Sequence, residues 1–401
     1  EARMRKKASL SAPIASALIM GLITLGEPKP DLPVAERDNS TFMMLEGLII
    51  VVIAIIIAII YIYNIVDARN TGKDYEKKGV VQSEREFIHN IGEKAFAYLG
   101  LSPSFIMLAF FVVIPLVFSF LIAFTNYSAP EHIPQKNTVD WVGLQTFRDM
   151  INLKQYSQGF IRTAVWTFEW AFIGTLTCYF GGMFLALALL DKNIKIPGFF
   201  RTIFILPYAV PGMISLFIWA ILLNGQFGPI TRSLRELGVI EWLQNIGVLQ
   251  RDVIPWLSDT TLAKIMLIVV NLWLGFPYFM LMITGIMTSM RQDIYEAARI
   301  DGASRSQQFR FITFPLLMYQ TIPLMIMSFA YNMNNGNPPD SLTTQSFAGT
   351  TDTLITWMYK LTLEQRLYNK ASVVAIVMFI VIAPFALYNF SKTKSFKDGE
   401  L

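Results

Sequence analysis

Residues 48–63 of this chain read LIIVVIAIIIAIIYIY, a run that carries no charged side chain and is rich in isoleucine. A helix needs about 20 mainly apolar residues to cross the hydrocarbon core of a bilayer. The apolar stretch that contains this run, residues 45–66, is long enough to do so. It therefore predicts a helix that spans a membrane.

The composition of the whole chain also indicates a membrane protein. Apolar residues make up 54% of the 401 residues and charged residues only 15%, whereas a typical soluble domain has about 25% charged residues. A soluble protein of this size has too little interior to hide so much apolar surface. The composition thus excludes a soluble enzyme, a disordered tail protein and a collagen-like fibre.

Scarce residue types exclude several kinds of site. The net charge of +4 is too small and too dispersed for nucleic-acid binding. A single cysteine, Cys178, allows no internal disulfide and no multi-cysteine metal site. The two histidines, His89 and His132, lie far apart in the sequence, which argues against a histidine-rich metal site. We expect no metal and no cofactor on this chain.

Eight stretches approach the length of a membrane span. The first is the weakest, because it contains polar residues and Pro13, and basic residues precede it as in a signal peptide. No convincing small-residue cleavage site follows, so we expect a retained helix. The sequence predicts an all-α, polytopic membrane protein with eight transmembrane helices, at roughly residues 8–25, 45–66, 104–125, 164–190, 202–223, 263–289, 314–334 and 371–391.

The distribution of lysine and arginine predicts the orientation, because cytoplasmic loops carry an excess of these residues. If the N-terminus is cytoplasmic, the cytoplasmic segments hold more than half of the 33 basic residues. Both termini are then cytoplasmic, and residues 67–100 form a charged linker with a short amphipathic helix near residues 84–96. The outside loops are residues 126–160, 224–262 and 335–369, and Trp141 and Trp256 in them suit anchoring at the membrane surface.

One cytoplasmic loop has a distinctive pattern. Residues 296–304 read EAARIDGAS, and Pro315 opens the next span. The pattern predicts a short helix that starts after Asp293 as its N-cap and stops at Gly302. The two alanines let another backbone approach closely, and Glu296 can form an ion pair across that contact. The loop is therefore expected to bind a cytoplasmic partner.

This pattern resembles the EAA loop of the permease subunits of ABC importers. In that family the loop, here residues 290–316, forms a coupling helix that sits in a cleft of a separate ATPase subunit. Phe314 stands where leucine is commoner in the family. The resemblance implies that the ATPase-coupling residues are Glu296, Ala297, Ala298, Asp301, Gly302 and Pro315.

Three further stretches resemble the carbohydrate branch of the same family. They are LPYAVP at residues 206–211, NLWLGFPY at residues 271–278 and SFAYNMNN at residues 328–335. They are most similar to the larger permease subunit of maltose and maltodextrin importers, the MalF type. The resemblance implies an ABC type I importer permease fold, in which residues 1–100 form an N-terminal helix pair and linker and residues 101–401 form the permease core. The loop at residues 126–160 is shorter than in enterobacterial members.

Polar and aromatic residues within three spans form a candidate sugar site. Polar groups inside a span are costly and tend to face a cavity or the bundle interior. Asparagine amides can bind sugar hydroxyls, and tyrosine rings can contact sugar C–H faces. The alternative role of each asparagine is a hydrogen bond between helices. By resemblance to the maltose branch, the pocket comprises Tyr208, Asn271, Leu274, Gly275, Tyr278, Ser328, Tyr331, Asn332 and Asn335.

Two details of this site are specific to the chain. Ser328, Asn332 and Asn335 fall on one face of a helix, whereas Gly212 has no side chain where a small polar group would help. The segment Gly275-Phe276-Pro277 predicts a break or kink in the sixth span, which is tolerated only beside a cavity.

The resemblance implies a non-enzymatic permease subunit of an ATP-driven importer for maltose- or maltodextrin-type oligosaccharides in a bacterial plasma membrane. The implied partners are a homologous second permease, two ATPase subunits that bind ATP and Mg²⁺, an external solute-binding protein, the oligosaccharide and lipid, but no nucleic acid. One alternative is the same machine with a raffinose-type sugar, an alginate oligomer or glycerol phosphate as cargo. The other is an ion-coupled secondary transporter, which would need carboxylates within the spans, where only Glu46, at the start of the second span, and Glu169 are found.

Overall fold

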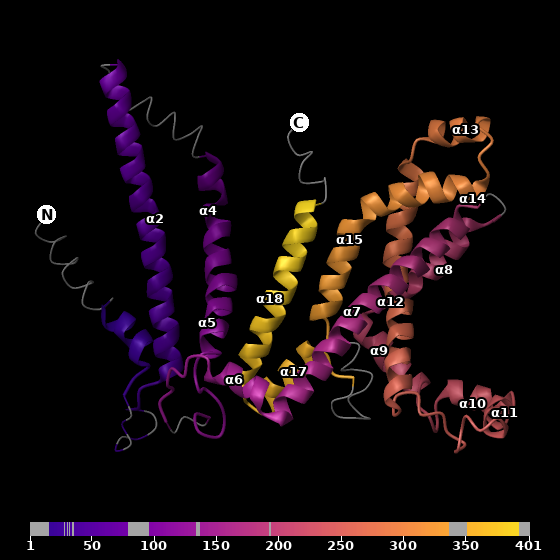
Figure 1. Ribbon diagram of the computed structural model, residues 1–401, viewed down its shortest axis with the longest axis horizontal. Coiled ribbons are helices and arrows are strands. Elements are labelled where there is room, and N and C mark those ends of the chain that lie inside the picture. The colour runs from indigo at the N-terminus through magenta and orange to yellow at the C-terminus, as the bar shows by residue number, and fades with distance from the viewer. Residues whose placement is uncertain are drawn as a thin grey trace, which may run out of the picture. The chain divides into compact units, whose positions relative to one another are not determined.

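The computed structural model describes residues 16–27, 29, 31, 33, 36–78, 96–133, 137–191, 194–336 and 351–392 (Figure 1). Apart from one isolated bridge between Thr125 and Trp141, the regular structure of these residues is helical. The predicted all-α class is therefore confirmed. The chain divides into two compact units, Glu1–Asp149 with Leu361–Val373 and Met150–Lys360 with Val374–Leu401.

Among the described residues, six helical segments are long and apolar enough to cross a membrane. A bent pair of helices, α8 (Pro197–Ala209) and α9 (Gly212–Leu222), adds a seventh when the pair is counted as one span. The predicted first span lies partly outside the described residues, and its residues 16–24 are helical. The six segments are Ser40–Lys73, Gly100–Ile122, Tyr156–Leu189, Thr260–Ser289, Arg305–Asn334 and Tyr368–Tyr388.

The first unit contains the long helix α2 (Ser40–Lys78) and a composite span of α4 (Phe96–Leu108), the π-helical turn η2 (Ala109–Val113) and α5 (Ile114–Ile122). Helix α2 packs on α5, and a small core forms around Leu25, Met44, Ile122 and Val139. Most of the apolar side chains in the middle of α2 are exposed, as expected for a helix that faces lipid. The predicted amphipathic helix near residues 84–96 lies outside the described residues, apart from Phe96.

The second unit is built around α7 (Lys154–Leu189), which packs on α12 (Thr260–Ser289) and α15 (Phe314–Asn334). Gly182 lets α12 come close, because a Cβ there would lie 2.6 Å from Phe279 Cβ and 2.7 Å from the backbone nitrogen of Met280. Small residues are the usual means of close helix approach in a membrane. The α7–α12 contact therefore fixes the centre of this unit.

Short helices lie at both ends of the second unit. Figure 1 shows α10 (Pro229–Glu236) and α11 (Val239–Asn245) at one end, and α13 (Gln292–Ile300) and α14 (Arg305–Gln308) at the other, with α12 between them. Because α12 is a candidate span, the two pairs lie toward opposite sides of the membrane.

The remaining elements are α6 (Gln145–Asn152), which straddles the boundary of the units, the π-helical turn η3 (Phe309–Thr313), α17 (Leu354–Tyr359), the π-helical turn η4 (Lys360–Glu364) and α18 (Tyr368–Lys392).

The break lies in the fifth span. For the sixth span the sequence predicts a break or a kink at Pro277, and the break is wrong because α12 is continuous there. Helices α8 and α9 are bent by 93°, and Val210 between them is extended (φ −86°, ψ 134°). Val210 precedes Pro211, and a residue before proline is disfavoured in the helical region. Helix α12 instead continues through Pro277, where Gly182 of α7 packs against Phe276 and Phe279 on either side of the proline.

Candidate functional site

A cavity of about 550 Å³ lies within the second unit, between α7, α8, α9, α12 and α15. All nine residues predicted for the sugar site line this cavity, so the structure brings them together. The other lining residues are Cys178, Pro207, Val210, Gly212, Met213, Leu216, Phe279, Leu324 and Met327.

Two buried asparagines form the polar part of the wall. Asn271 of α12 is 8% exposed and Asn332 of α15 is 5% exposed. Asn332 Nδ2 donates to Thr175 Oγ1 at 3.1 Å, and Asn271 Nδ2 lies 3.5 Å from Cys178 Sγ. Both contacts hold the amides against α7, as the interhelical alternative predicts, yet each amide group has a second N–H and an oxygen that these contacts do not use.

Sequence reasoning missed the support that α7 gives to these amides. A Cβ at Gly174 would lie 2.9 Å from Asn271 Nδ2 and 3.5 Å from Asn332 Nδ2, and a Cβ at Gly275 would lie 2.6 Å from Cys178 Sγ. The signal was the small residues Gly174 and Cys178, four apart on one helix face. Cys178 packs in the core of the second unit, and it lines the cavity as well.

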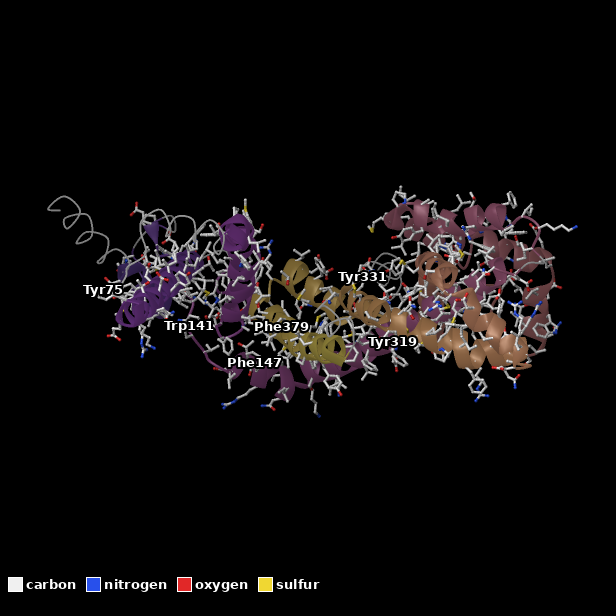
Figure 2. All side chains as sticks on the ribbon, turned by 90° about the horizontal axis from the view of Figure 1, so that it is seen from above. Tyr75, Trp141, Phe147, Tyr319, Tyr331 and Phe379 are labelled. Carbon is white, nitrogen blue, oxygen red and sulfur yellow. The ribbon has the colours of Figure 1, made fainter. Side chains whose placement is uncertain are left out.

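Three tyrosines supply the aromatic part of the wall. Tyr208 is 59% exposed and Tyr331 is 65% exposed, whereas Tyr278 is half-buried and makes an edge contact with Phe279 at 5.2 Å between ring centroids. Figure 2 labels Tyr331 on α15. The cavity thus combines two fixed amides with exposed rings, an arrangement that can contact both the hydroxyl groups and the C–H faces of a sugar.

Gly212 lies where the broken fifth span meets the cavity. It is the first residue of α9, and Pro211 before it gives no side-chain cap. An added Cβ at Gly212 would meet nothing within 4 Å. There is therefore room for a side chain at this position, and the chain supplies none.

The predicted coupling loop is found as α13 and the turn that follows it. Asp293 lies in the first turn of α13 and the N-cap is Arg291, so the prediction of Asp293 as N-cap is wrong. Asp301 is the C-cap, and Gly302 has φ +78°. Ala303 N donates to Ala298 O at 2.9 Å and Gly302 N to Arg299 O at 3.1 Å, which are the two bonds of a Schellman motif. The predicted stop at Gly302 is therefore confirmed.

The other predicted coupling residues lie on α13 and at the start of α15. Glu296 and Ala297 are exposed on α13, and Ala298 is half-buried. Pro315 lies in the first turn of α15, directly after η3. A second short helix, α14, starts with a capping box between Ser304 and Gln307 and leads into this turn.

Several other residues singled out in the sequence have structural partners. Glu169 lies 3.9 Å from Lys264 Nζ, which also sits 4.3 Å from the centre of the Trp166 ring. Trp256 donates to Thr231 Oγ1 at 2.8 Å and Trp141 donates to Leu22 O at 3.3 Å. Within the described residues no group of three or more histidine, cysteine, aspartate or glutamate side chains could hold a metal ion.

Comparison with known proteins gives a consistent match. The family model described as binding-protein-dependent transport system inner membrane component matches residues 178–393. The chain is 35% identical over 384 residues to the galactooligosaccharides transport system permease protein GanP of Bacillus subtilis, covering 94% of this chain and 88% of GanP. It is 32% identical over 395 residues to the maltodextrin transport system permease protein MdxF of the same organism, covering 96% and 87%.

Two further matches cover less of the chain. The maltose/maltodextrin transport system permease protein MalF of Escherichia coli is 34% identical over 263 residues, which are 63% of this chain and 49% of MalF. Among solved structures, a chain of a bacterial ABC transporter involved in the import of the acidic polysaccharide alginate superposes with a TM-score of 0.63 at 20% identity, covering 77% of this chain and 98% of that chain.

Proposed function

Because this chain belongs to the binding-protein-dependent inner-membrane permeases of ABC sugar importers, we propose that its cavity binds a maltodextrin-type oligosaccharide during transport. The family is one of transport permeases. The chain is accordingly proposed to act without chemistry of its own, as half of a translocation pore.

The observation that carries this proposal is the convergence of nine residues, drawn from three separate stretches of sequence, on one cavity. Its volume of about 550 Å³ falls in the usual range for small-molecule sites, about 300–1,000 Å³. Buried amides beside exposed tyrosine rings suit a neutral, hydroxyl-rich ligand. The proposed binding residues are the same nine residues.

The uncharged wall favours a neutral sugar over an anion. The described residues that line the cavity include no lysine or arginine, whereas carboxylate and phosphate ligands are usually held by such side chains. This argues against alginate oligomers and glycerol phosphate as cargo. A galactooligosaccharide is the second candidate cargo, because the relative GanP carries that name.

We propose the following assembly for the chain. A homologous second permease completes the pore, two ATPase subunits bind ATP and Mg²⁺, and an external binding protein delivers the sugar. Residues 290–316 dock on an ATPase through Glu296, Ala297, Ala298, Asp301, Gly302 and Pro315. Residues 1–100 form the N-terminal pair and linker and residues 101–401 the permease core, with both termini in the cytoplasm. The complex of the alginate transporter with a sugar-bound periplasmic protein is a precedent for such delivery.

In the proposed cycle, closure of the ATPases moves the coupling helices. The spans then rock and open the cavity outward, and hydrolysis resets them. Family membership gives no support to the ion-coupled alternative.

Sugar-stimulated ATP hydrolysis by the purified complex tests the cargo. Maltodextrins, galactooligosaccharides, a raffinose-type sugar, alginate oligomers and glycerol phosphate are compared, each with the binding protein present. The proposal predicts the largest stimulation by maltodextrins. Stimulation by galactooligosaccharides alone would select the second candidate, and stimulation by an anionic cargo alone would contradict the neutral cavity.

A further inference from the structure

Helix α13 presents two different faces. Asp293, Glu296, Ala297 and Ile300 follow helical spacing along one exposed stripe, and Ile300 is 87% exposed. None of the residues of α13 is buried, and Tyr295 and Ala298 on the other face are half-buried. The position of α13 is therefore not fixed by a buried apolar core, and polar contacts of its inner face gain importance.

The Tyr295 hydroxyl joins α13 to the ends of two spans. Tyr295 Oη lies 3.0 Å from Thr313 Oγ1 and 3.2 Å from Met290 Sδ. Met290 is the C-cap residue of α12, and Thr313 is the last residue of η3, directly before α15. Thr313 is only 5% exposed and Tyr295 is half-buried, so their contact is partly shielded from solvent.

The Tyr295–Thr313 contact belongs to a small hydrogen-bond network. Either hydroxyl can donate in it, because the Tyr295 hydroxyl can also donate to Met290 Sδ and Thr313 Oγ1 can also donate to Gln308 O at 3.4 Å. Gln308 Nε2 in turn donates to Ala303 O at 2.9 Å, in the turn that follows α13. The π-helical turn η3 ends two residues before Pro315, which has no backbone N–H to give. Turns of this kind are frequent at functional sites.

Helix α15 connects this contact to the cavity. It runs without interruption from Phe314 to Asn334, a length of about 30 Å at 1.5 Å per residue. Asn332 lies near its far end and Asn335 is its C-cap residue. The backbone links α13 to α12 and to α14 through residues that are not helical, since Met290 is extended and Gly302 is in the left-handed conformation.

We propose that the Tyr295–Thr313 hydroxyl pair is a positioning contact that transmits movement of α13 to α15, and thereby to the cavity. This inference rests on the proposed function, because it assumes an ATPase that moves α13. Without the pair, the non-helical residues at the two ends of α13 change conformation instead, and α15 moves less. Fewer sugar molecules are then transported for each ATP hydrolysed.

Four variants of the complete complex, reconstituted in liposomes, test the inference. Tyr295→Phe and Thr313→Val each remove one hydroxyl, the double variant removes both, and Thr313→Ser keeps the hydroxyl as the matched control. The measured quantity is the number of sugar molecules imported per ATP hydrolysed. We expect each single change to lower this ratio about threefold to tenfold, the usual effect of losing one hydrogen bond. The double variant should fall no further than the lower of the two single variants, because only the contact between the two hydroxyls joins α13 to η3, whereas the Met290 and Gln308 contacts do not.

Several outcomes overturn the inference. They are an unchanged ratio in Tyr295→Phe, a Thr313→Ser ratio as low as that of Thr313→Val, and additive losses in the double variant. Loss of the ATPase subunits from both hydroxyl-deleted variants on purification also overturns it, because the pair would then maintain the docking site itself. If the unaltered complex shows no ATP-dependent sugar uptake, the proposed function itself is wrong. If the unaltered complex takes up sugar and the variants give one of the outcomes above, only the role of the hydroxyl pair is wrong.

Discussion

Gly174 of α7 lies directly behind Asn271 of α12, so close that a Cβ at position 174 would stand 2.9 Å from the Asn271 amide nitrogen. The same Cβ would lie 3.5 Å from the amide nitrogen of Asn332. The absence of a side chain at one position of α7 thus sets where two cavity amides can lie.

Gly174→Ala is therefore expected to displace the amides and weaken sugar binding. We predict a Michaelis constant for uptake about threefold to tenfold higher, since one or two hydrogen bonds of the usual strength would be impaired. Gly159→Ala is the matched control on α7, because its Cβ would make only an ordinary contact of 3.7 Å with Trp357. Equal Michaelis constants for the two variants would show that Gly174 does not position the cavity.

Replacement of both Asn332 and Asn335 by alanine is expected to abolish uptake and leave docking of the ATPase intact. Both residues line the cavity, and their amides would lose contact with the sugar. Asn334→Ala is the control, because Asn334 is exposed and its amide donates to Ala330 O in its own helix. Uptake and ATPase co-purification are measured on the same preparations, and normal uptake by the double variant would remove both residues from the site.

Gly302→Ala is expected to weaken attachment of the ATPase about fivefold. Gly302 has φ +78° with open space around an added Cβ, so the change acts through backbone strain of about 1 kcal/mol. Gly302→Asn should bind better, because asparagine tolerates this conformation. Gly198→Ala, which also meets open space, serves as control in a titration of purified ATPase. Unchanged affinity in Gly302→Ala would place the turn outside the docking site.

Gly182→Ala is expected to destabilise the second unit. Its Cβ would meet the backbone of α12 at 2.7 Å, and forcing an extra carbon into a packed interior usually costs about 1–3 kcal/mol. Thermal unfolding in detergent should therefore begin at a lower temperature than in Gly285→Ala, where nothing lies within 4 Å. Identical unfolding of the two variants would contradict the close α7–α12 contact.

The length of apolar runs was enough to predict the spans, and the family pattern was enough to place nine residues around one cavity. The fifth span shows where this reasoning stops. The proline rule applies equally before Pro211 and before Pro277, yet the helix ends before the first and continues through the second, where α7 packs closely on α12.

The supporting contacts could not be predicted for a related reason. Thr175 and Asn332 are separated by 157 residues, and Tyr295 and Thr313 belong to different helices. Neither pair has a local signature, since each depends on how two helices pack. Helical periodicity shows which residues share a face but not which helix that face meets.

The most direct test of the whole account is sugar uptake by the purified complex in sealed liposomes that contain ATP, with the binding protein outside. The account predicts uptake of a neutral oligosaccharide that requires ATP hydrolysis and persists when ionophores remove the proton and sodium gradients. Uptake that continues without ATP and collapses with an ion gradient would contradict it.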